Sequence, residues 1–458
     1  MSCASAARKE ALNILSYARA HKSYVRNLIY TSPSLKHLSF EDQAFVTKLV
    51  LGVTSSLGIL DEAIDKYVDK PNKLAPALRD VLRIATFELF FLHKEPYVVV
   101  DQGVELAKIT AKHGSGLANA VLRKIAEDAQ SFPYGDPQES FEALARSTGF
   151  PLELARLIED SLGTTRTRSL MSSQLKPAPL FVVTIPFKTA DTKVQDIFDA
   201  HNIVATPILG IAGGWSIHTP HEFLRSGLID SHGFLPMDFS AQMIAKLVAT
   251  NEMGSILEIG SGRGTKTADI VSQAARKGER VDITAFELYP YKSKIAKERL
   301  EKLGIDFVKH VNGNATKASD LEGLGQFDTV FIDAPCSGTG TLRRHPELVW
   351  NLKLSAIKSL NTLQFKMLKN TAKHVAPGGA LIYSTCSVLK MENEDMVQKF
   401  LNSKAGQDFE LNDVVNRKGI SKEFKEKLTE HSHNKMIRTF VQEGSADAHF
   451  CALLKRKA

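Results

Sequence analysis

The sequence predicts an α/β protein whose second half folds as a doubly wound parallel sheet, preceded by an all-α bundle and a small α+β unit. Three observations lead to this fold class. Apolar residues recur three and four apart from Ala6 to about Ala129, which is the spacing of one helix face. Short β-branched runs follow from Pro177. From Phe239 onward, short apolar strands alternate strictly with helical segments, as in repeated βα units.

The helical pattern of the first region breaks at points rich in Pro, Gly and Ser, which terminate helices. These breaks fall at 32–34, 70–72, 95–96 and 113–116. Their spacing predicts about six or seven helices, which would form a domain of their own at residues 1–135. Because the region holds no cluster of reactive side chains, we expect a binding or scaffolding domain.

A linker, SFPYGDP, and a short helix lead into the second region, for which we predict a domain at 136–236. Its β-branched runs are short and separated by turn residues, which favours a small α+β unit. The expected elements are helices at 152–162 and 191–201 and strands at 180–185, 203–209 and 215–218.

The third region, predicted as a domain at 237–458, contains the alternating strands and helices. Crossover connections make the strands of such units parallel, so their carboxyl ends share one edge of the sheet, where ligands bind. The expected strands are 255–259, 281–287, 306–311, 327–333 and 380–385. One expected helix follows the glycine-rich turn after the first strand and ends at about 275, and the others span 291–303, 355–375 and 392–400.

Composition and charge are those of a folded globular chain, with 458 residues, 43% hydrophobic and 24% charged. The net charge is +7, of which residues 1–150 contribute only +1, from 18 basic and 17 acidic residues. This excess fits a polyanionic partner or merely a solvated surface. The N-terminus has no apolar signal-peptide core, and the longest uncharged stretch, 201–221, is interrupted by Pro and Gly. We therefore expect a cytoplasmic protein without a membrane span.

The chain has four cysteines, Cys3, Cys336, Cys386 and Cys451, and no C-x-x-C pair. They are too few and too scattered for a disulfide scaffold, and their spacing does not fit a structural zinc site. We expect reduced thiols and no metal.

Polar and glycine-rich segments follow the first three strands. The first strand runs into Gly260-Ser261-Gly262-Arg263-Gly264-Thr265-Lys266, whose glycines allow a tight turn and a close approach to a ligand. Such a turn is compatible with NAD, FAD or S-adenosylmethionine, and also with no ligand. Glu287 ends the second strand, where a carboxylate can accept ribose hydroxyls, and Asn314 follows the third, where it could read an adenine edge. Each of these two could also be an ordinary surface or turn residue.

The fourth strand ends in DAPCSGTGTLRRHPE, which places an acid, Asp333, near a thiol, Cys336. The next strand ends in YSTCSV and supplies Cys386 at its own carboxyl end. A single cysteine is more often a buried structural residue. Two of them at neighbouring strand ends, beside a nucleotide-type turn, favour catalysis instead.

Two thiols and an acid suit methylation at carbon 5 of a pyrimidine. A thiolate that adds to carbon 6 turns the ring into an enamine-like species, whose carbon 5 can attack a methyl sulfonium. The acid can hold or protonate N3 as charge builds there, and the second thiol can assist loss of the C5 proton and release of the enzyme. Methylation of an exocyclic amine needs no thiol, so the cysteines favour carbon methylation.

The segments DAPCSGTGTLRRHPE and YSTCSV…ENE closely resemble motifs IV and VI of the RNA (cytosine-5)-methyltransferases, in the RsmB/Fmu/Sun branch that acts on bacterial 16S rRNA. The resemblance covers essentially the whole chain. It implies a NusB-like RNA-binding domain at 1–135, an RNA-recognition-like unit within 136–236, and a Rossmann-like S-adenosylmethionine methyltransferase domain at 237–458. The C-terminal DAHFCALLKRK resembles the closing strand of the family.

The resemblance also implies the role of each site residue. Cys386 would be the nucleophile, Cys336 the cysteine that assists product release, and Asp333 the catalytic acid, lying also near the cofactor. S-adenosyl-L-methionine would be bound by the loop Gly260 to Lys266, with Glu287 as the ribose acid and Asn314 as the adenine reader.

Two departures from the family pattern concern the cofactor. The first motif of the family reads C-A-A-P-G-G-K-T, whereas this chain has GSGRGTKT. The acids that follow strands two and three are usually Asp, and here they are Glu287 and Asn314. The carbonyl of Asn314 can accept one bond from an amine, where a carboxylate accepts two.

Contacts to RNA are predicted for Arg343 and Arg344, which follow the catalytic loop and could clamp phosphates beside a flipped cytosine. The alternative is a surface pair that binds local carboxylates. We expect the isolated aromatics Trp215 and Tyr291 to lie in the core, with base stacking as the alternative.

The predicted function is therefore methylation of carbon 5 of a cytosine in RNA, with 16S rRNA as the partner and a monomer as the expected state. Two alternatives stay open. One is the same chemistry on tRNA. The other is a NusB-like RNA-binding or assembly factor, whose methyltransferase domain binds the cofactor without turnover.

Overall fold

The structure is a computed structural model that describes residues 4–111, 113–249, 254–417 and 419–458, so Cys3 lies outside it. The chain divides into two compact units. The helical unit comprises residues 1–177 and 342–352, and the sheet-containing unit comprises residues 178–341 and 353–458. The boundary predicted at 135/136 stays a prediction, but the helices that follow it belong to the helical unit.

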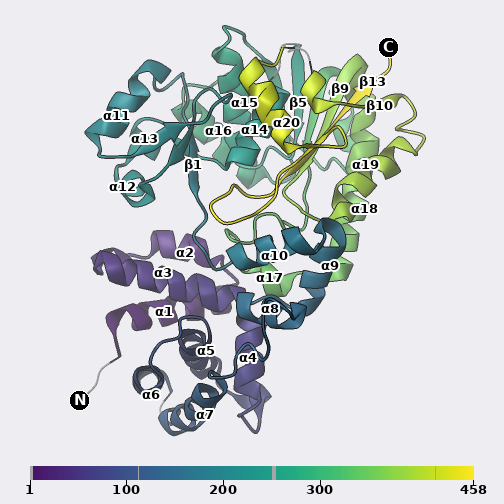
Figure 1. The fold of residues 1–458 in the computed structure, drawn as a ribbon. Coiled ribbons are helices and arrows are strands. Elements are labelled where there is room, and N and C mark those ends of the chain that lie inside the picture. The colour runs from purple at the N-terminus through teal and green to yellow at the C-terminus, as the bar shows by residue number, and fades with distance from the viewer. Residues whose placement is uncertain (1–3, 112, 250–253, 418) are drawn as a thin grey trace. The chain divides into compact units, whose positions relative to one another are not determined.

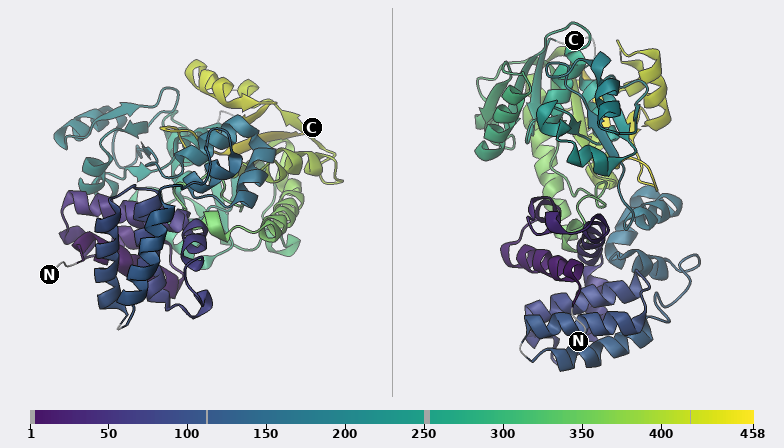
Figure 2. Two further views of the ribbon diagram at one scale, coloured as in Figure 1. Left: turned by 60° about the horizontal axis from the view of Figure 1, so that its bottom comes forward. Right: turned by 90° about the vertical axis from the view of Figure 1, so that its left-hand side faces the viewer.

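The helical unit contains seven α-helices in its described residues before position 135, in agreement with the predicted six or seven (Figures 1 and 2). Ser5 caps the first helix by accepting a bond from the Arg8 amide, and Pro76 and Pro96 open later helices at the position where proline is favoured. The helices are α1 (Ala6–His21), α2 (Val25–Thr31), α3 (Phe40–Ser55), α4 (Leu57–Asp65), α5 (Pro76–Phe90), α6 (Pro96–Thr110), α7 (Ser115–Asp128), α8 (Phe141–Thr148), α9 (Leu152–Leu162), α10 (Thr164–Ser173) and α17 (Leu348–Asn351).

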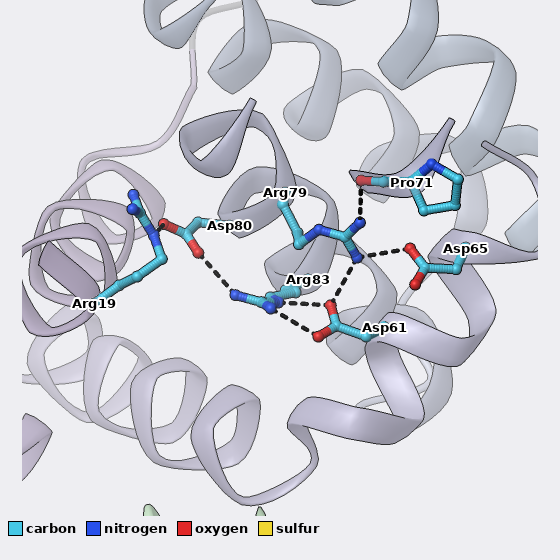
Figure 3. A network of polar contacts seen from close by, with 7 residues as sticks. All are labelled: Arg19, Asp61, Asp65, Pro71, Arg79, Asp80 and Arg83. Atoms are coloured by element: carbon cyan, nitrogen blue, oxygen red, sulfur yellow. Dashed lines mark hydrogen bonds and ion pairs between the residues drawn. The ribbon is translucent and has the colours of Figure 1, made fainter. Parts of the chain in front are cut away.

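Arginines of the helical unit are paired with carboxylates (Figure 3). Asp61 binds Arg83 through two bonds, of 2.8 and 2.7 Å, and Arg79 at 3.2 Å. Asp80 joins Arg83 at 3.1 Å to Arg19 at 2.8 Å. These cations are therefore balanced within the fold and add little field for a polyanion.

Within the described residues, no single helix is long and apolar enough to cross a membrane. The pair α3 and α4, bent by 75°, reaches that length and composition together.

A small antiparallel sheet begins the second unit. Its strand order is β2-β3-β1-β4, and its core contains Val182, Phe198 and Phe223, all fully buried. Trp215 is partly buried and packs edge-on against Phe198 at the margin of this core, with ring centroids 5.2 Å apart. The elements are β1 (Leu180–Val183), α11 (Val194–Ala200), β2 (Ala205–Pro207), β3 (Gly214–Ile217), α12 (Pro220–Arg225), α13 (Leu228–Ser231) and β4 (Leu235–Pro236).

The large sheet has the order β11-β12-β13-β9-β8-β5-β6-β7, with β10 also pairing β13. Strands β5 to β9 are parallel, as predicted, whereas β10, β12 and β13 add an antiparallel edge. The elements are α14 (Phe239–Val248), β5 (Ser255–Ile259), α15 (Thr265–Ala275), β6 (Asp282–Glu287), α16 (Pro290–Lys302), β7 (Lys309–Asn312), β8 (Phe327–Asp333), α18 (Leu354–Thr371), β9 (Val375–Thr385), α19 (Glu394–Leu401), β10 (Phe409–Asn412), α20 (Lys422–His431), β11 (Ser432–His433), β12 (Met436–Arg438) and β13 (Phe450–Arg456).

Helices cover both faces of this sheet. Because alternate strand residues point to opposite sides, one strand contributes side chains to both cores. In β8, Phe331 joins the core formed with α14, α15 and α20, whereas Val330 and Ile332 join the core formed with α18 and α19. The order of the strands reverses between β5 and β8, and ligands of such sheets bind at the carboxyl ends beside that reversal.

Candidate functional site

The glycine-rich loop after β5 lies at the reversal point. Gly260, Gly262 and Gly264 have φ of 84°, 59° and 78°, in the left-handed region that side chains disfavour. A Cβ on Gly260 would lie 2.6 Å from the carbonyl oxygen of Asp333, so the loop packs directly on the end of β8. Arg299 of α16 holds the loop by donating to the Thr265 hydroxyl at 2.9 Å. The three glycines therefore allow a tight turn whose backbone packs closely on β8.

Within this loop the predicted residues differ in exposure. Ser261 is 6% exposed, and its hydroxyl has no hydrogen-bond partner within the described protein. Arg263 is exposed, and Lys266 points toward Asp333 at the end of β8. An unpaired buried hydroxyl between two glycines fits a polar ligand, because buried polar groups are normally satisfied.

Glu287 ends β6 beside the loop and is 5% exposed. Its Oε2 accepts a bond from the Gly262 amide at 2.9 Å, and its Oε1 accepts one from the Tyr289 amide at 3.0 Å. Each carboxylate oxygen keeps a further lone pair. The side chain is therefore held in place with acceptor capacity left for a diol.

Asn314 follows β7, but its side-chain oxygen is already engaged. It accepts bonds from the Thr316 amide at 3.0 Å and the Thr316 hydroxyl at 2.7 Å. Since a backbone N–H can only donate, the atom facing Thr316 is the oxygen, and the side-chain NH₂ remains as the group that can meet a ligand. The predicted carbonyl contact to an adenine amine stays a prediction, and this turn competes with it.

Lys266 and Asp333 form an ion pair across the reversal point, with Nζ and Oδ2 2.6 Å apart. Burial disfavours the charge on Lys266, but the attraction of Asp333 outweighs it, so the pKa of Lys266 is raised. The predicted acid therefore acts beside a fixed cation. The sequence placed both residues in the site without indicating that they pair.

The two predicted thiols converge. The Sγ atoms of Cys336 and Cys386 lie 3.3 Å apart, and both residues keep partial solvent exposure. The hydrogen bond from Cys336 lowers the pKa of Cys386, with Lys266 acting in the same direction against burial. The same bond and burial raise the pKa of Cys336. Cys386 is thus the better nucleophile, since the thiolate is the reactive form.

Cys451 on β13 is fully buried, and burial raises its pKa to about 12. It is a structural thiol and does not take part in the site.

A buried carboxylate that the sequence did not single out joins the two thiol-bearing loops. Glu392 accepts bonds from the Ser337 amide at 2.9 Å and from the hydroxyls of Ser337 and Ser387, each at 2.5 Å. It also accepts a bond from Gln364 of α18 at 3.1 Å. The E-N-E segment, quoted above as part of a motif, was the available signal.

Gly340 packs the loop that follows Cys336 against two other segments. Its amide donates to the Cys386 carbonyl at 2.9 Å, and its carbonyl accepts from the Ala448 amide at 3.0 Å. A Cβ here would lie 2.1 Å from the Ala448 oxygen. The glycine therefore helps to set the position of the Cys386 backbone.

Residues 342–352, directly after this loop, belong to the helical unit. Arg26 donates to the carbonyls of Arg343 and Arg344, at 3.1 and 2.9 Å. Trp350 donates to the carbonyls of Ser55 and Gly149, at 2.8 and 3.0 Å. The Arg343 side chain is 6% exposed and that of Arg344 is half-buried, so the predicted contacts of this pair to phosphates stay a prediction.

Among the described residues, no group of three or more His, Cys, Asp and Glu side chains is arranged to hold a metal ion.

Two family models match the chain, one before and one after the segment that forms the small antiparallel sheet. The NusB family matches residues 5–127, and the family described as 16S rRNA methyltransferase RsmB/F matches residues 245–455. The second range contains every predicted catalytic and cofactor residue.

Curated relatives match over most of the chain. A probable ribosomal RNA small subunit methyltransferase B from Synechocystis is 29% identical, covering 86% of this chain and 89% of its own length. A protein of the same description from Bacillus subtilis is 26% identical, covering 86% and 88%. The ribosomal RNA small subunit methyltransferase B of Vibrio cholerae is 25% identical, covering 79% and 81%.

Solved structures share the fold. The crystal structure of PH0851 superposes with a TM-score of 0.76 and 21% identity, covering all of both chains. NSun6 from Pyrococcus horikoshii superposes with a TM-score of 0.54 and 16% identity, over 68% of this chain and 99% of its own.

Proposed function

Because this chain belongs to the RsmB/F family of 16S rRNA methyltransferases, with a NusB-family domain before the catalytic one, we propose which atoms carry out its RNA methylation. The proposed reaction is transfer of a methyl group from S-adenosyl-L-methionine to carbon 5 of a cytosine in 16S rRNA. It proceeds through a covalent bond between Cys386 and carbon 6. The observation that carries the proposal is the 3.3 Å contact between the two thiols beside the Lys266–Asp333 pair.

The residues around the glycine-rich loop fit the cofactor. The Gly260 turn would admit its amino-acid portion, with the unpaired Ser261 hydroxyl as a polar contact. Glu287 would accept the ribose hydroxyls, and Asn314 would donate from its NH₂ to an adenine ring nitrogen, because its oxygen is occupied. When bound, S-adenosyl-L-methionine supplies an electrophilic methyl group on a sulfonium.

The first step is addition of the Cys386 thiolate to carbon 6. The double bond between carbons 5 and 6 becomes a single bond, and negative charge develops toward N3 and O2 of the ring. The Lys266–Asp333 pair lies at the same edge of the sheet. There the Lys266 ammonium can donate to that side of the base, and the Asp333 side chain can help to orient it. Carbon 5 then becomes the nucleophile that takes the methyl group.

The second step removes the proton of carbon 5. Once the Cys386 sulfur is bonded to carbon, it carries no negative charge, and the interaction that raised the pKa of Cys336 is lost. Cys336 then yields its proton to solvent more readily and can accept the proton of carbon 5. Re-formation of the ring double bond expels the Cys386 thiolate, which again accepts a hydrogen bond from Cys336. The cycle releases one proton.

The test is transfer of labelled methyl groups to 16S rRNA and, in parallel, to tRNA. Cys386→Ala is expected to be inactive, and Cys336→Ala to accumulate a protein–RNA adduct that survives denaturation. Cys451→Ala provides a control for the loss of a thiol, since Cys451 is a fully buried residue in the middle of the sheet. Wild-type product from Cys386→Ala overturns the proposal. Product on tRNA alone assigns the other RNA, and cofactor binding without transfer to either RNA supports the non-catalytic alternative.

A further inference from the structure

An apolar run of four residues is exposed directly after Glu287. Leu288, Tyr289 and Tyr291 are 46%, 48% and 58% exposed, and Pro290 between them is also exposed. Exposed runs of three or four consecutive apolar residues are unfavourable unless they have a function. The expectation that Tyr291 lies in the core is therefore wrong, because the ring projects from the first turn of α16.

The two tyrosine rings form one local surface. Their centroids are 5.8 Å apart at an interplanar angle of 46°, and the Lys292 ammonium lies 4.7 Å from the centre of the Tyr289 ring. The backbone beneath them is fixed, because the Tyr289 amide is bonded to Glu287 and Pro290 opens α16. The rings are thus presented on a fixed backbone and not on a free loop.

The helix that carries the rings is basic. It contains five Lys and Arg residues and two Glu residues, which gives a local charge of +3. The helix is also tied to the glycine-rich loop, through the bond from Arg299 to Thr265. Aromatic rings combined with cations at the rim of a site are the usual means of binding unpaired nucleotides, since every base has a face that can stack.

We propose that Tyr289, Tyr291 and Lys292 form a stacking platform for unpaired nucleotides that flank the target cytosine. The proposal rests on the proposed function, because it assumes that the thiols act on RNA. The platform lies at the same sheet edge as the thiols, with β6 separated from β8 only by β5. The nucleophile Cys386 follows β9, one strand beyond β8. Neighbouring strands are about 4.8 Å apart, so three spacings place the platform roughly 14 Å from that strand end, which is about two nucleotides away.

Stacking is tested with the full chain by fluorescence anisotropy of a labelled, unpaired 12-nucleotide RNA and of the same RNA in a duplex. Tyr289→Ala and Tyr291→Ala should each weaken binding of the unpaired RNA about 5- to 100-fold, as loss of one stacked base does. Tyr291→Phe should retain binding, whereas Tyr291→Leu should lose it. Lys292→Ala should reduce the slope of log Kd against log salt by about 1.

The control is Leu354→Ala, because Leu354 is also a large exposed apolar side chain, 49% exposed, and lies outside the NusB-like domain. Binding of S-adenosylhomocysteine, measured by calorimetry, should not change in any platform variant. Its loss would overturn the proposal and assign the rings to the adenine. Equal binding of the unpaired RNA by Tyr291→Leu and Tyr291→Phe excludes stacking. A change in sedimentation from a dimer to a monomer would assign the face to a second copy.

The two proposals can fail separately. A wild-type chain that binds unpaired RNA through the tyrosines but transfers no methyl group refutes the proposed function and leaves the platform standing. A wild-type chain that methylates RNA with the same KM for RNA as its tyrosine variants refutes the platform alone.

Discussion

Glu392 offers a quantitative test of how the two thiols are held together. It lies in the short turn after β9, is fully buried, and accepts four hydrogen bonds from two loops and one helix. Replacing it with Ala removes the oxygen that accepts from both the Ser337 amide and the Gln364 side chain. The thiol-bearing loops would then be held in register by weaker contacts.

The size of the effect follows from which donors lose their acceptor. The hydroxyls of Ser337 and Ser387 can bond to each other at 3.2 Å and to Thr339 at 3.1 Å, so they remain satisfied. The Ser337 amide and one N–H of Gln364 do not. A buried donor without a partner costs about 1–3 kcal/mol, so Glu392→Ala should lose about 2–6 kcal/mol of stability. That corresponds to a fall in Tm of roughly 5–15 °C for a unit of this size.

Glu392→Gln should lose less, because its amide oxygen can still accept from the Ser337 amide and Gln364. Calorimetry gives Tm, and hydrogen exchange at residues 386–389 shows whether the loss is local. Glu410→Ala, at an exposed glutamate on β10, is the matched control and should stay within about 0.5 kcal/mol of wild type. A Glu392→Ala protein as stable as that control, with unchanged methyl transfer, refutes the reasoning.

Three further outcomes are expected. Lys266→Met should raise the pKa of Cys386, because the ammonium charge lowers it. The rate of thiol alkylation and kcat/KM should therefore rise with pH at a higher pH than in the wild type, and an unchanged pH profile contradicts this. Gly340→Ala should cost at least about 1–3 kcal/mol and most of the activity, since its Cβ meets a backbone oxygen at 2.1 Å, while Gly116→Ala, with open space, should be tolerated. Burial raises the pKa of Glu258 to about 7, so its protonated form favours the fold, and stability is lost as pH rises through 7. The free energies of unfolding of Glu258→Gln and of wild type should therefore diverge by about 2–3 kcal/mol between pH 5 and pH 8, as denaturant unfolding would measure. Parallel pH curves for the two proteins would contradict this.

Local patterns were enough to predict the strands that carry the site. Ser255–Ile259 and Phe327–Asp333 have the bounds expected from the sequence, because each is a short, mostly buried run that ends at Gly or at a loop. Parallel strands also explain why Cys336 and Cys386, fifty positions apart, could be expected at one edge.

Features that depend on distant segments were not predictable in this way. The antiparallel insertion of β13 beside β9 depends on how the C-terminal segment returns to the sheet. The pairing of Lys266 with Asp333 depends on the packing of the loop against β8, and periodicity carries no information about it. Tyr291 was expected in the core because aromatic residues usually are buried there, and function is the competing reason for exposing one.

The insertion of residues 342–352 into the helical unit has a consequence for synthesis on the ribosome. Trp350 fills the space beside Gly58, where a Cβ would lie 2.0 Å from the indole, and it bonds to carbonyls at the ends of α3 and α8. These partners are all made before residue 177, and the tryptophan follows 173 residues later. At about 5–20 residues per second, the nascent helices wait roughly 10–35 s for a part of their own core. A chaperone that shields this gap during elongation would therefore act on a defined interval of translation.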